Sequence, residues 1–250
     1  MSELKFEICA NSVQSCIAAQ KGGADRVELC AGIPEGGTTP SYGEILLARK
    51  YLTIKLHIII RPRGGDFLYS PLELEIMEND IINAQKLGAD GIVLGCLDKA
   101  GSIDIASCKK LISHAQGMSI TFHRAFDCCQ NQLIALEQII DMGCERILSS
   151  GGYPTAEEGI IQLNTLNKAA NGRIKIMAGC GVNQNNIAKI HKDTKIKEFH
   201  FSAREILTSK MQYLNSKVYM GLPGIKENEI PETTSNEVKK IIKAVSKSNL

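Results

Sequence analysis

The chain has 250 residues, and its 29 Lys and Arg nearly balance its 27 Asp and Glu, for a formal net charge of +2. This balance excludes recruitment of nucleic acid or a membrane surface by bulk charge. The nine cysteines show no Cys-x-x-Cys spacing, which argues against a secreted disulfide scaffold and favours a reducing, cytoplasmic compartment. No apolar run approaches the roughly 18 residues of a membrane span, and we find no N-terminal secretory pattern.

Short strand patterns alternate with helical patterns along the whole chain. The first two strands, 6–9 and 27–30, read Phe-Glu-Ile-Cys and Val-Glu-Leu-Cys and flank a helix over 12–21. Further strands are predicted at 56–61, 90–95, 119–124, 146–150, 174–179 and 197–202, with the last helix at about 236–247. Eight such units predict a (β/α)8 barrel, a fold of typically about 250 residues. A doubly wound open sheet is the alternative.

No linker divides the chain, so residues 1–250 are predicted to form a single domain. One long irregular segment, about 203–234, separates the last strand from the last helix. Unstructured loops of this length are usually functional or form an extra subdomain.

Polar side chains gather at the predicted strand ends, where barrels of this type carry their chemistry. Side chains two residues apart on a strand share a face, so Glu7 lies beside Cys9, and Glu28 beside Cys30. Charged groups are rarely buried unpaired, so their convergence needs a reason. The strand-end candidates in chain order are Glu7, Cys9, Glu28, Cys30, His57, Arg61, Arg63, His123, Arg124, Asp127, Gly181, His200 and Ser202.

These groups indicate an enzyme that acts on a small phosphorylated or carboxylate metabolite by acid–base chemistry. The candidate catalytic residues are Glu7, Glu28, His123 and Asp127. The candidate anion-binding residues are Arg61, Arg63 and Arg124, with Gly181 and Ser202 after strands seven and eight, where such barrels often bind phosphate. No Lys lies at the top of a predicted strand, which disfavours a Schiff-base mechanism. The structural alternative is that an inward Glu or His forms an ion pair with Arg61 or Arg124.

Several motifs together resemble the CutC family of copper homeostasis proteins, over about residues 5–221. They are Glu-Ile-Cys at 7–9, Gly-Ala-Asp-Arg-Val-Glu-Leu-Cys at 23–30, Glu-Gly-Gly-Thr-Thr-Pro-Ser at 35–41, Ile-Arg-Pro-Arg-Gly-Gly-Asp-Phe at 60–67, Thr-Phe-His-Arg-Ala-Phe-Asp at 121–127 and Gly-Cys-Gly-Val at 179–182. The resemblance implies a cytoplasmic (β/α)8 barrel, a homo-oligomer (dimer or tetramer), a role in copper tolerance, and Cu(I) binding by Cys9 and Cys30. From about residue 224 onward the chain departs from the family pattern.

The copper hypothesis agrees with the chemistry of the two thiols. Cu(I) is soft and prefers thiolates, and adjacent strands lie about 4.8 Å apart, so two sulfurs could bracket one ion. The carboxylates of Glu7 and Glu28 oppose thiol deprotonation, while nearby arginines would offset them. A hard divalent ion held by Glu7, Glu28 and a His ranks third, after copper and the enzyme. We expect a copper ion or a small anion as partner, no organic cofactor, no nucleic acid and no membrane.

The remaining cysteines have a simpler interpretation. Free Cys is among the most buried residue types and packs as a small hydrophobe. We therefore predict a packing role for Cys16, Cys108, Cys128, Cys129 and Cys144. For Cys9 and Cys30 packing and ligation remain equal alternatives.

Overall fold

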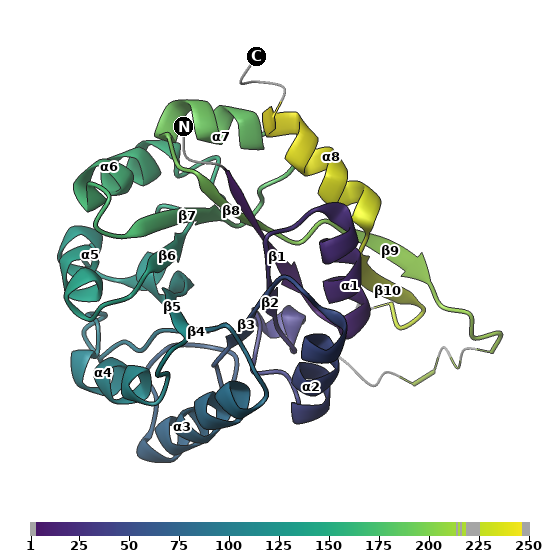
Figure 1. The fold of residues 1–250 in the computed structure, drawn as a ribbon, viewed down its shortest axis with the longest axis horizontal. Helices are drawn as coiled ribbons and strands as arrows, with labels where there is room; N and C mark the ends of the chain where they lie inside the picture. The colour runs from purple at the N-terminus through teal and green to yellow at the C-terminus, as the bar shows by residue number, and fades with distance from the viewer. Residues whose placement is uncertain (1–3, 214, 216, 219–225, 247–250) are drawn as a thin grey trace.

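The computed structural model describes residues 4–213, 215, 217–218 and 226–246, and it confirms the predicted barrel. Eight strands pair in parallel in chain order, and β1 closes the barrel against β8 (Figure 1). The barrel strands are β1 (Lys5–Ala10), β2 (Arg26–Leu29), β3 (Lys55–Ile59), β4 (Gly91–Leu94), β5 (Ser119–Phe122), β6 (Arg146–Ser149), β7 (Lys175–Gly179) and β8 (Glu198–Phe201). The open-sheet alternative is therefore wrong.

Helices form the outer layer around the barrel in Figure 1. They are α1 (Val13–Gly22), α2 (Tyr42–Tyr51), α3 (Pro71–Lys86), α4 (Ile105–Ser113), α5 (Gln132–Asp141), α6 (Ile160–Ala170), α7 (Ile187–Thr194) and α8 (Ser235–Ser246), with 3-10 turns η1 (Ile33–Glu35) and η2 (Arg124–Cys128). Both α2 and α3 begin with a Ser–Glu capping box, at Ser41 and Ser70, which satisfies the first free N–H groups of each helix. The last helix ends at Ser246 among the described residues, and residue 247 of the predicted helix lies outside them.

Strand register determines which side chains face one another inside the barrel. Glu7 on β1 pairs with His200 on β8, and Cys9 pairs with Glu28, which pairs in turn with His57 on β3. The intervening residues, such as Ile8, Leu29 and Ile58, are fully buried or nearly so in the apolar core. This alternation gives the barrel an apolar outer face against the helices and an unusually polar interior.

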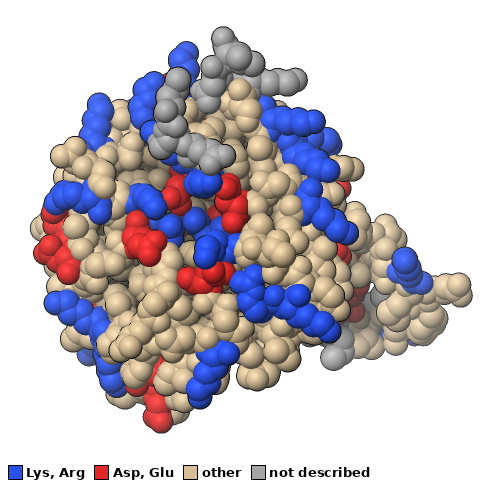
Figure 2. Space-filling model, viewed as in Figure 1, with Lys and Arg blue, Asp and Glu red and all other residues tan. Residues whose placement is uncertain are grey.

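The N-terminal ends of the strands carry a buried ion network. Arg26, Arg146 and Glu198 are the first residues of β2, β6 and β8, and all are buried. The Arg26 Nη2 and Arg146 Nε groups donate to the same Glu198 oxygen, at 2.9 and 3.1 Å. Figure 2 shows basic and acidic side chains side by side over the middle of the barrel. Opposite charges in contact allow these groups to be buried.

The segment about 203–234, predicted to be irregular, contains a short strand near each of its ends in the structure. Its ends form β9 (Arg204–Thr208) and β10 (Glu229–Thr233), an antiparallel pair that projects beside α1 in Figure 1. The main-chain N–H of Thr233 donates to the Ser15 hydroxyl at 3.1 Å, which fastens β10 to α1. Most side chains of the pair are exposed. Because neither strand has a regular buried face, its sequence lacks the alternation of apolar and polar residues that predicts a half-buried strand. Residues 214, 216 and 219–225 of this segment lie outside the described residues.

The described helices are all too short or too polar to cross a bilayer. All nine cysteines are free. Several pack as predicted: Cys16 and Cys108 are fully buried, and Cys144 is 5% exposed. Cys128 is exposed and Cys129 is half-buried, so the packing prediction is wrong for Cys128.

Candidate functional site

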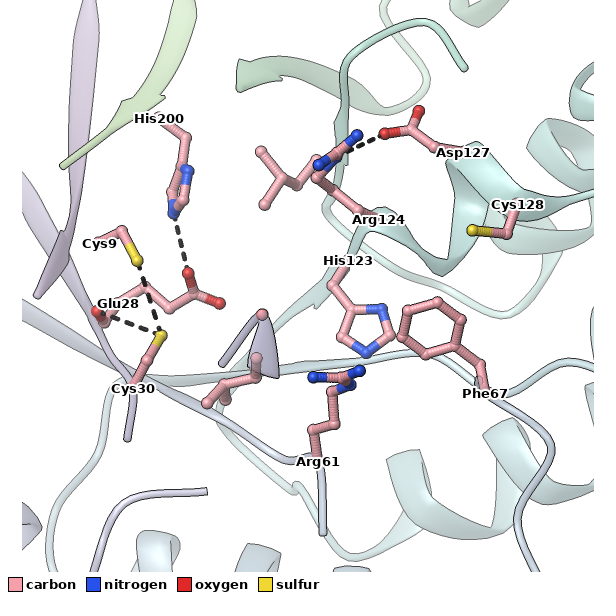
Figure 3. A pocket seen from close by; sticks show the side chains of 13 residues that line it. Cys9, Glu28, Cys30, Arg61, Phe67, His123, Arg124, Asp127, Cys128 and His200 are labelled. Atoms are coloured by element: carbon pink, nitrogen blue, oxygen red, sulfur yellow. Dashed lines mark hydrogen bonds and ion pairs between the residues drawn. The ribbon is translucent and has the colours of Figure 1, made fainter. Parts of the chain in front are cut away.

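A pocket of about 280 Å³ opens among the C-terminal ends of the strands (Figure 3). One wall carries two thiols, and the other carries arginine, imidazole and apolar groups. The lining residues are Cys9, Glu28, Cys30, Gly36, Ile59, Arg61, Phe67, His123, Arg124, Asp127, Cys128, Leu148 and His200. The predicted site residues that line this pocket are Cys9, Glu28, Cys30, Arg61, His123, Arg124 and Asp127. The four that do not are Glu7, Arg63, Gly181 and Ser202.

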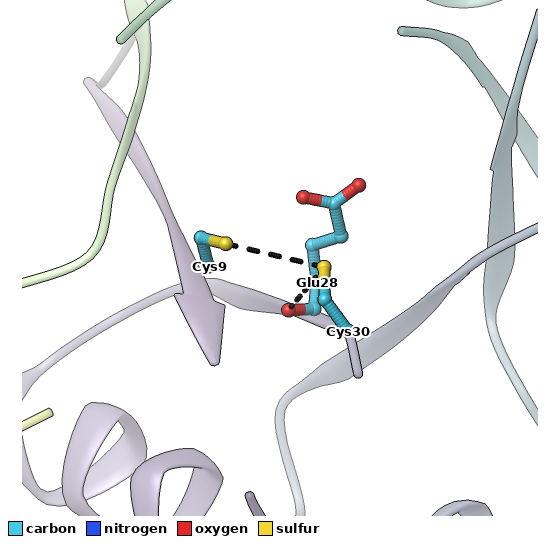
Figure 4. A group of neighbouring side chains, drawn as sticks. All are labelled: Cys9, Glu28 and Cys30. Atoms are coloured by element: carbon cyan, nitrogen blue, oxygen red, sulfur yellow. Dashed lines mark hydrogen bonds between the residues drawn. The ribbon is translucent and has the colours of Figure 1, made fainter. Parts of the chain in front are cut away.

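The thiols of Cys9 and Cys30 face one another from β1 and the end of β2 (Figure 4). Their sulfur atoms lie 3.9 Å apart, and the Cys30 sulfur is also 3.8 Å from the main-chain oxygen of Glu28. The guanidinium of Arg204 on β9 lies 3.4 Å from the Cys9 sulfur. This contact gives the β9–β10 pair a place in the site that the sequence did not indicate.

The two thiols have opposite acidities. The hydrogen bond with Cys30, aided by His200 and Arg204 and opposed by burial, lowers the pKa of Cys9 well below its usual value. The same hydrogen bond, burial and the charge of Glu28 raise the pKa of Cys30. Cys9 is therefore the more acidic thiol of the pair.

His200 joins this cluster because the barrel closes between β1 and β8. Its Nε2 lies 2.8 Å from a carboxylate oxygen of Glu28. Burial opposes its protonation, but hydrogen bonds to Cys9 and Glu28 raise the pKa of His200 well above its usual value. Burial raises the pKa of Glu28, while His200 opposes that rise. The sequence placed His200 at a strand end but gave it no role; closure of the barrel supplies its partner.

Glu7 lies deeper in the barrel than the pocket. It is 1% exposed and forms an ion pair with the Nε group of Arg26. Burial raises its pKa, but Arg26, His200 and His57 prevail and hold the pKa of Glu7 at about 2. The structure thus favours the structural interpretation for Glu7, with Arg26 as the partner in place of Arg61 or Arg124.

Arg63, Gly181 and Ser202 are engaged elsewhere. Arg63 binds Glu73 at 2.5 Å and the main-chain oxygen of Leu68 at 2.8 Å, on the outside of the barrel. A side chain on Gly181 would meet Thr155, and the main-chain oxygen of Ser202 accepts from Thr233 of β10. Neither Gly181 nor Ser202 lines the pocket, so a phosphate held there would not meet main-chain donors of these two residues.

Asp127 lines the pocket, but both of its carboxylate oxygens are already bonded. One accepts from the Ser149 hydroxyl at 2.6 Å and from the Gly152 N–H at 3.0 Å. The other accepts from the Ser150 hydroxyl at 2.9 Å and from Arg124 Nε at 2.8 Å. Such a saturated carboxylate positions Arg124 and the loop after β6, and it has little capacity left to act as a base.

Arg61 and His123 form the opposite wall with Phe67. Arg61 is 5% exposed, and its Nη groups donate to three main-chain carbonyls, those of Glu35, Gly37 and Gly65, at 2.7–2.9 Å. Burial, with a contribution from Arg61, lowers the pKa of His123 to about 3, so the ring is neutral. The ring of Phe67 lies 5.2 Å from the Arg61 guanidinium carbon and 4.9 Å from the His123 ring centre. Phe67 is the last residue of the motif at 60–67, but the sequence did not predict it as a site residue.

Among the described residues, two groups of side chains have the ligand atoms for a metal ion within 4.8 Å of one another. The first is Cys9, Glu28 and Cys30, which contains the two thiols predicted to bind Cu(I). The second is Glu7, Glu28 and His200, which supplies the histidine of the third-ranked hypothesis, a hard divalent ion. Arg26 already neutralises Glu7, so a cation there would face a guanidinium in contact with one of its ligands. The first set is chemically the better one.

The buried neutral imidazoles of His57 and His123 predict a loss of stability in mild acid. Burial lowers the pKa of each to about 3, whereas unfolded histidine takes up its proton near about 6.5. Below about pH 6.5 the unfolded chain therefore binds more protons, and stability falls by up to about 1.4 kcal/mol per pH unit for each histidine. Urea unfolding of the parent between about pH 6.5 and 5 should show this slope. The slope should be shallower for His123→Asn; an equal slope in both proteins would contradict this prediction.

A closed parallel barrel with its pocket at the strand C-termini defines a TIM-barrel protein. Thiamine phosphate pyrophosphorylase from Pyrococcus furiosus has this fold, with a TM-score of 0.62 at 16% identity over 98% of this chain and 96% of that one. The chain belongs to the CutC family, whose model matches residues 4–205. The resemblance found in the sequence is thereby confirmed.

Relatives match nearly the whole chain. A family protein CutC of Bacteroides fragilis is 58% identical over 250 residues, which covers 99% of this chain and 100% of the relative. One of Bacteroides thetaiotaomicron is 58% identical over 247 residues, covering 98% and 99%. The crystal structure of a CutC protein from Streptococcus agalactiae superposes with a TM-score of 0.77 at 38% identity, over 80% of this chain and 98% of that one.

Proposed function

We propose that this chain is a cytoplasmic copper homeostasis protein that binds Cu(I) through Cys9 and Cys30. The observation that carries the proposal is the 3.9 Å separation of the two sulfur atoms at the pocket. With metal–sulfur bonds of about 2.3 Å, as found for zinc, two sulfurs around one ion lie about 3.8 Å apart in a tetrahedral site and about 4.6 Å apart in a linear one. Small side-chain rotations cover this range, so the backbone need not move.

Charge also supports Cu(I) at this place. Two thiolates and one Cu(I) carry a net charge of −1, and that charge needs a cation nearby. His200 and Arg204 lie beside Cys9 and supply positive charge. The free state of all nine cysteines supports a reducing compartment, in which Cu(I) and thiolates persist.

Replacing both thiols should abolish tight Cu(I) binding. We expect the double variant Cys9→Ser and Cys30→Ser to bind Cu(I) at least about 100-fold more weakly, about 2.7 kcal/mol, because a hydroxyl is a poor ligand for a soft ion. The measurement is competition with a chromophoric Cu(I) chelator under reducing conditions. Cys128→Ser is the matched control, since this exposed thiol lines the same pocket and should leave affinity unchanged. Parent-like affinity in the double variant would disprove the site.

The enzyme alternative remains a prediction, with a smaller set of residues. Glu28 and His123 line the pocket, while Glu7 is paired with Arg26 and Asp127 is saturated by hydrogen bonds.

The homo-oligomer also remains a prediction. The β9–β10 pair exposes Ile206 and Ile230, 59% and 48% exposed, and is the surface we would test first for self-association.

A further inference from the structure

Two buried N–H donors in the pocket wall have no acceptor. Among the described residues, neither Arg61 Nε nor His123 Nε2 has a hydrogen-bond partner, and both atoms are shielded from water. The Nδ1 atom of His123 accepts from the Ala125 N–H at 3.2 Å, so in the neutral ring the proton lies on Nε2. Figure 3 shows the His123 ring directed at the Arg61 guanidinium.

Such an arrangement is costly in a protein without a ligand. A buried donor left unsatisfied costs about 1–3 kcal/mol, and native structures contain few of them. The side chains cannot easily turn away. Three main-chain carbonyls hold Arg61, Phe67 packs against both groups, and a side chain at Gly95 would approach His123 Nδ1 to 2.7 Å. The wall is therefore held rigidly in a form that an incoming oxygen would complete.

The charges near this wall favour a ligand that carries a single negative charge. Arg61 donates to three main-chain carbonyls and also interacts with the Tyr69 hydroxyl. Among the described residues no carboxylate forms an ion pair with it, whereas Arg124 is paired with Asp127. The far wall carries Glu28 and Cys9 beside His200 and Arg204, so it adds no net positive charge that would favour a second negative charge on the ligand. A phosphate would also lack the main-chain donors of Gly181 and Ser202, which lie outside the lining.

Shape and polarity define the rest of the ligand. Ile59, Phe67 and Leu148 contribute apolar surface to the lining. The volume of about 280 Å³ lies near the lower end for ligand pockets, which begin at about 300 Å³. We propose that Arg61 and His123 bind the carboxylate of a small monocarboxylic acid, whose carbon chain lies against Ile59, Phe67 and Leu148. One oxygen accepts from Arg61 Nε–H and from His123 Nε2–H, and the site is independent of the thiol pair.

Butyrate is a suitable probe, with butyramide and inorganic phosphate for comparison. We expect calorimetric titration of the full chain at about neutral pH to detect butyrate, to give at least tenfold weaker binding for butyramide, and to detect no phosphate. Butyramide keeps the shape and loses the charge, so it isolates the contribution of Arg61. Absence of butyrate binding at concentrations up to tens of millimolar, or equal binding of phosphate, would overturn the proposal.

Variants test whether these side chains bind a ligand or only support the fold. His123→Phe keeps a ring beside Phe67 but removes the donor, and it should weaken butyrate binding at least tenfold, whereas His123→Asn keeps an N–H donor and should recover part of the affinity. Arg173→Met is the control, because this exposed side chain lies outside the lining, and it should bind like the parent. Butyrate is titrated in the absence of copper, so failure of the copper proposal leaves this result unchanged. Parent-like binding by a folded His123→Phe protein would disprove the assignment.

Discussion

Replacing Arg26 with methionine should lower the free energy of unfolding by about 3–5 kcal/mol, the usual cost of leaving one partner of a buried ion pair alone. Arg26 donates to Glu7 and, at 2.9 Å, to Glu198. Glu198 would keep Arg146 at 3.1 Å. Glu7 would keep only the imidazoles of His57 and His200, each 3.8 Å from one of its oxygens. The loss therefore falls mainly on Glu7.

The pH dependence of this loss identifies Glu7 as its source. Despite burial, Arg26 and the nearby histidines hold the pKa of Glu7 at about 2, below its ordinary value of 4.5. The stability that Glu7 contributes is thus present above about pH 4.5 and is lost as the pH falls through about 2. The difference in the free energy of unfolding between Arg26→Met and the parent should accordingly be largest near neutral pH. It should become smaller below about pH 4.5.

Urea unfolding followed by circular dichroism measures both effects. Adding Glu7→Gln to Arg26→Met should restore much of the stability, because the uncompensated charge is removed. Arg173→Met is the matched control: its bidentate pair with Glu137 has similar distances, 2.7 Å, but its side chains are 44% and 52% exposed. Exposed pairs contribute about 0–1 kcal/mol. If Arg26→Met lost as little stability as the Arg173→Met control, the prediction would be contradicted.

Gly159→Ala should destabilise the chain by about 3 kcal/mol, at the upper end of the cost of overpacking. A Cβ atom at Gly159 would lie 1.8 Å from the main-chain oxygen of Ser150. The backbone of Gly159 has φ −86°, which alanine adopts readily, so the loss reports the close contact and not backbone strain. The clash involves main chain, which cannot rotate away as a side chain would.

The same substitution should disturb the pocket. Ser150 bonds Asp127 through its N–H and its hydroxyl, and Arg124 Nη2 donates to that hydroxyl at 2.8 Å. Movement of Ser150 therefore moves Arg124. Gly43→Ala is the control, because nothing lies within 4 Å of its added carbon, and alanine gains about 0.5–1 kcal/mol over glycine inside a helix. Thermal unfolding of the two variants should move in opposite directions; a Gly159→Ala protein as stable as the parent would refute the contact.

Periodicity along the chain was enough to predict the barrel and half of the site. Strand side chains alternate between two faces, so Glu28 and Cys30 had to share one, and Cys9 had to face the same interior from the next strand. Strand-end placement likewise predicted that Arg61, His123 and Arg124 would line one pocket, as they do. These are local rules, and residues far away cannot change them.

Partner choice was decided only by the tertiary structure. Glu7 and Glu28 follow the same sequence pattern, yet the register sets Glu7 beside Arg26 and closure of the barrel sets Glu28 beside His200. Asp127 looked like a free base until the folded loop after β6 surrounded it with donors, and Arg61 looked like a free anion clamp until three carbonyls took most of its N–H groups. Hydrogen bonds and ion pairs act over a few ångströms in space, and the positions they join in this chain are as much as 220 residues apart.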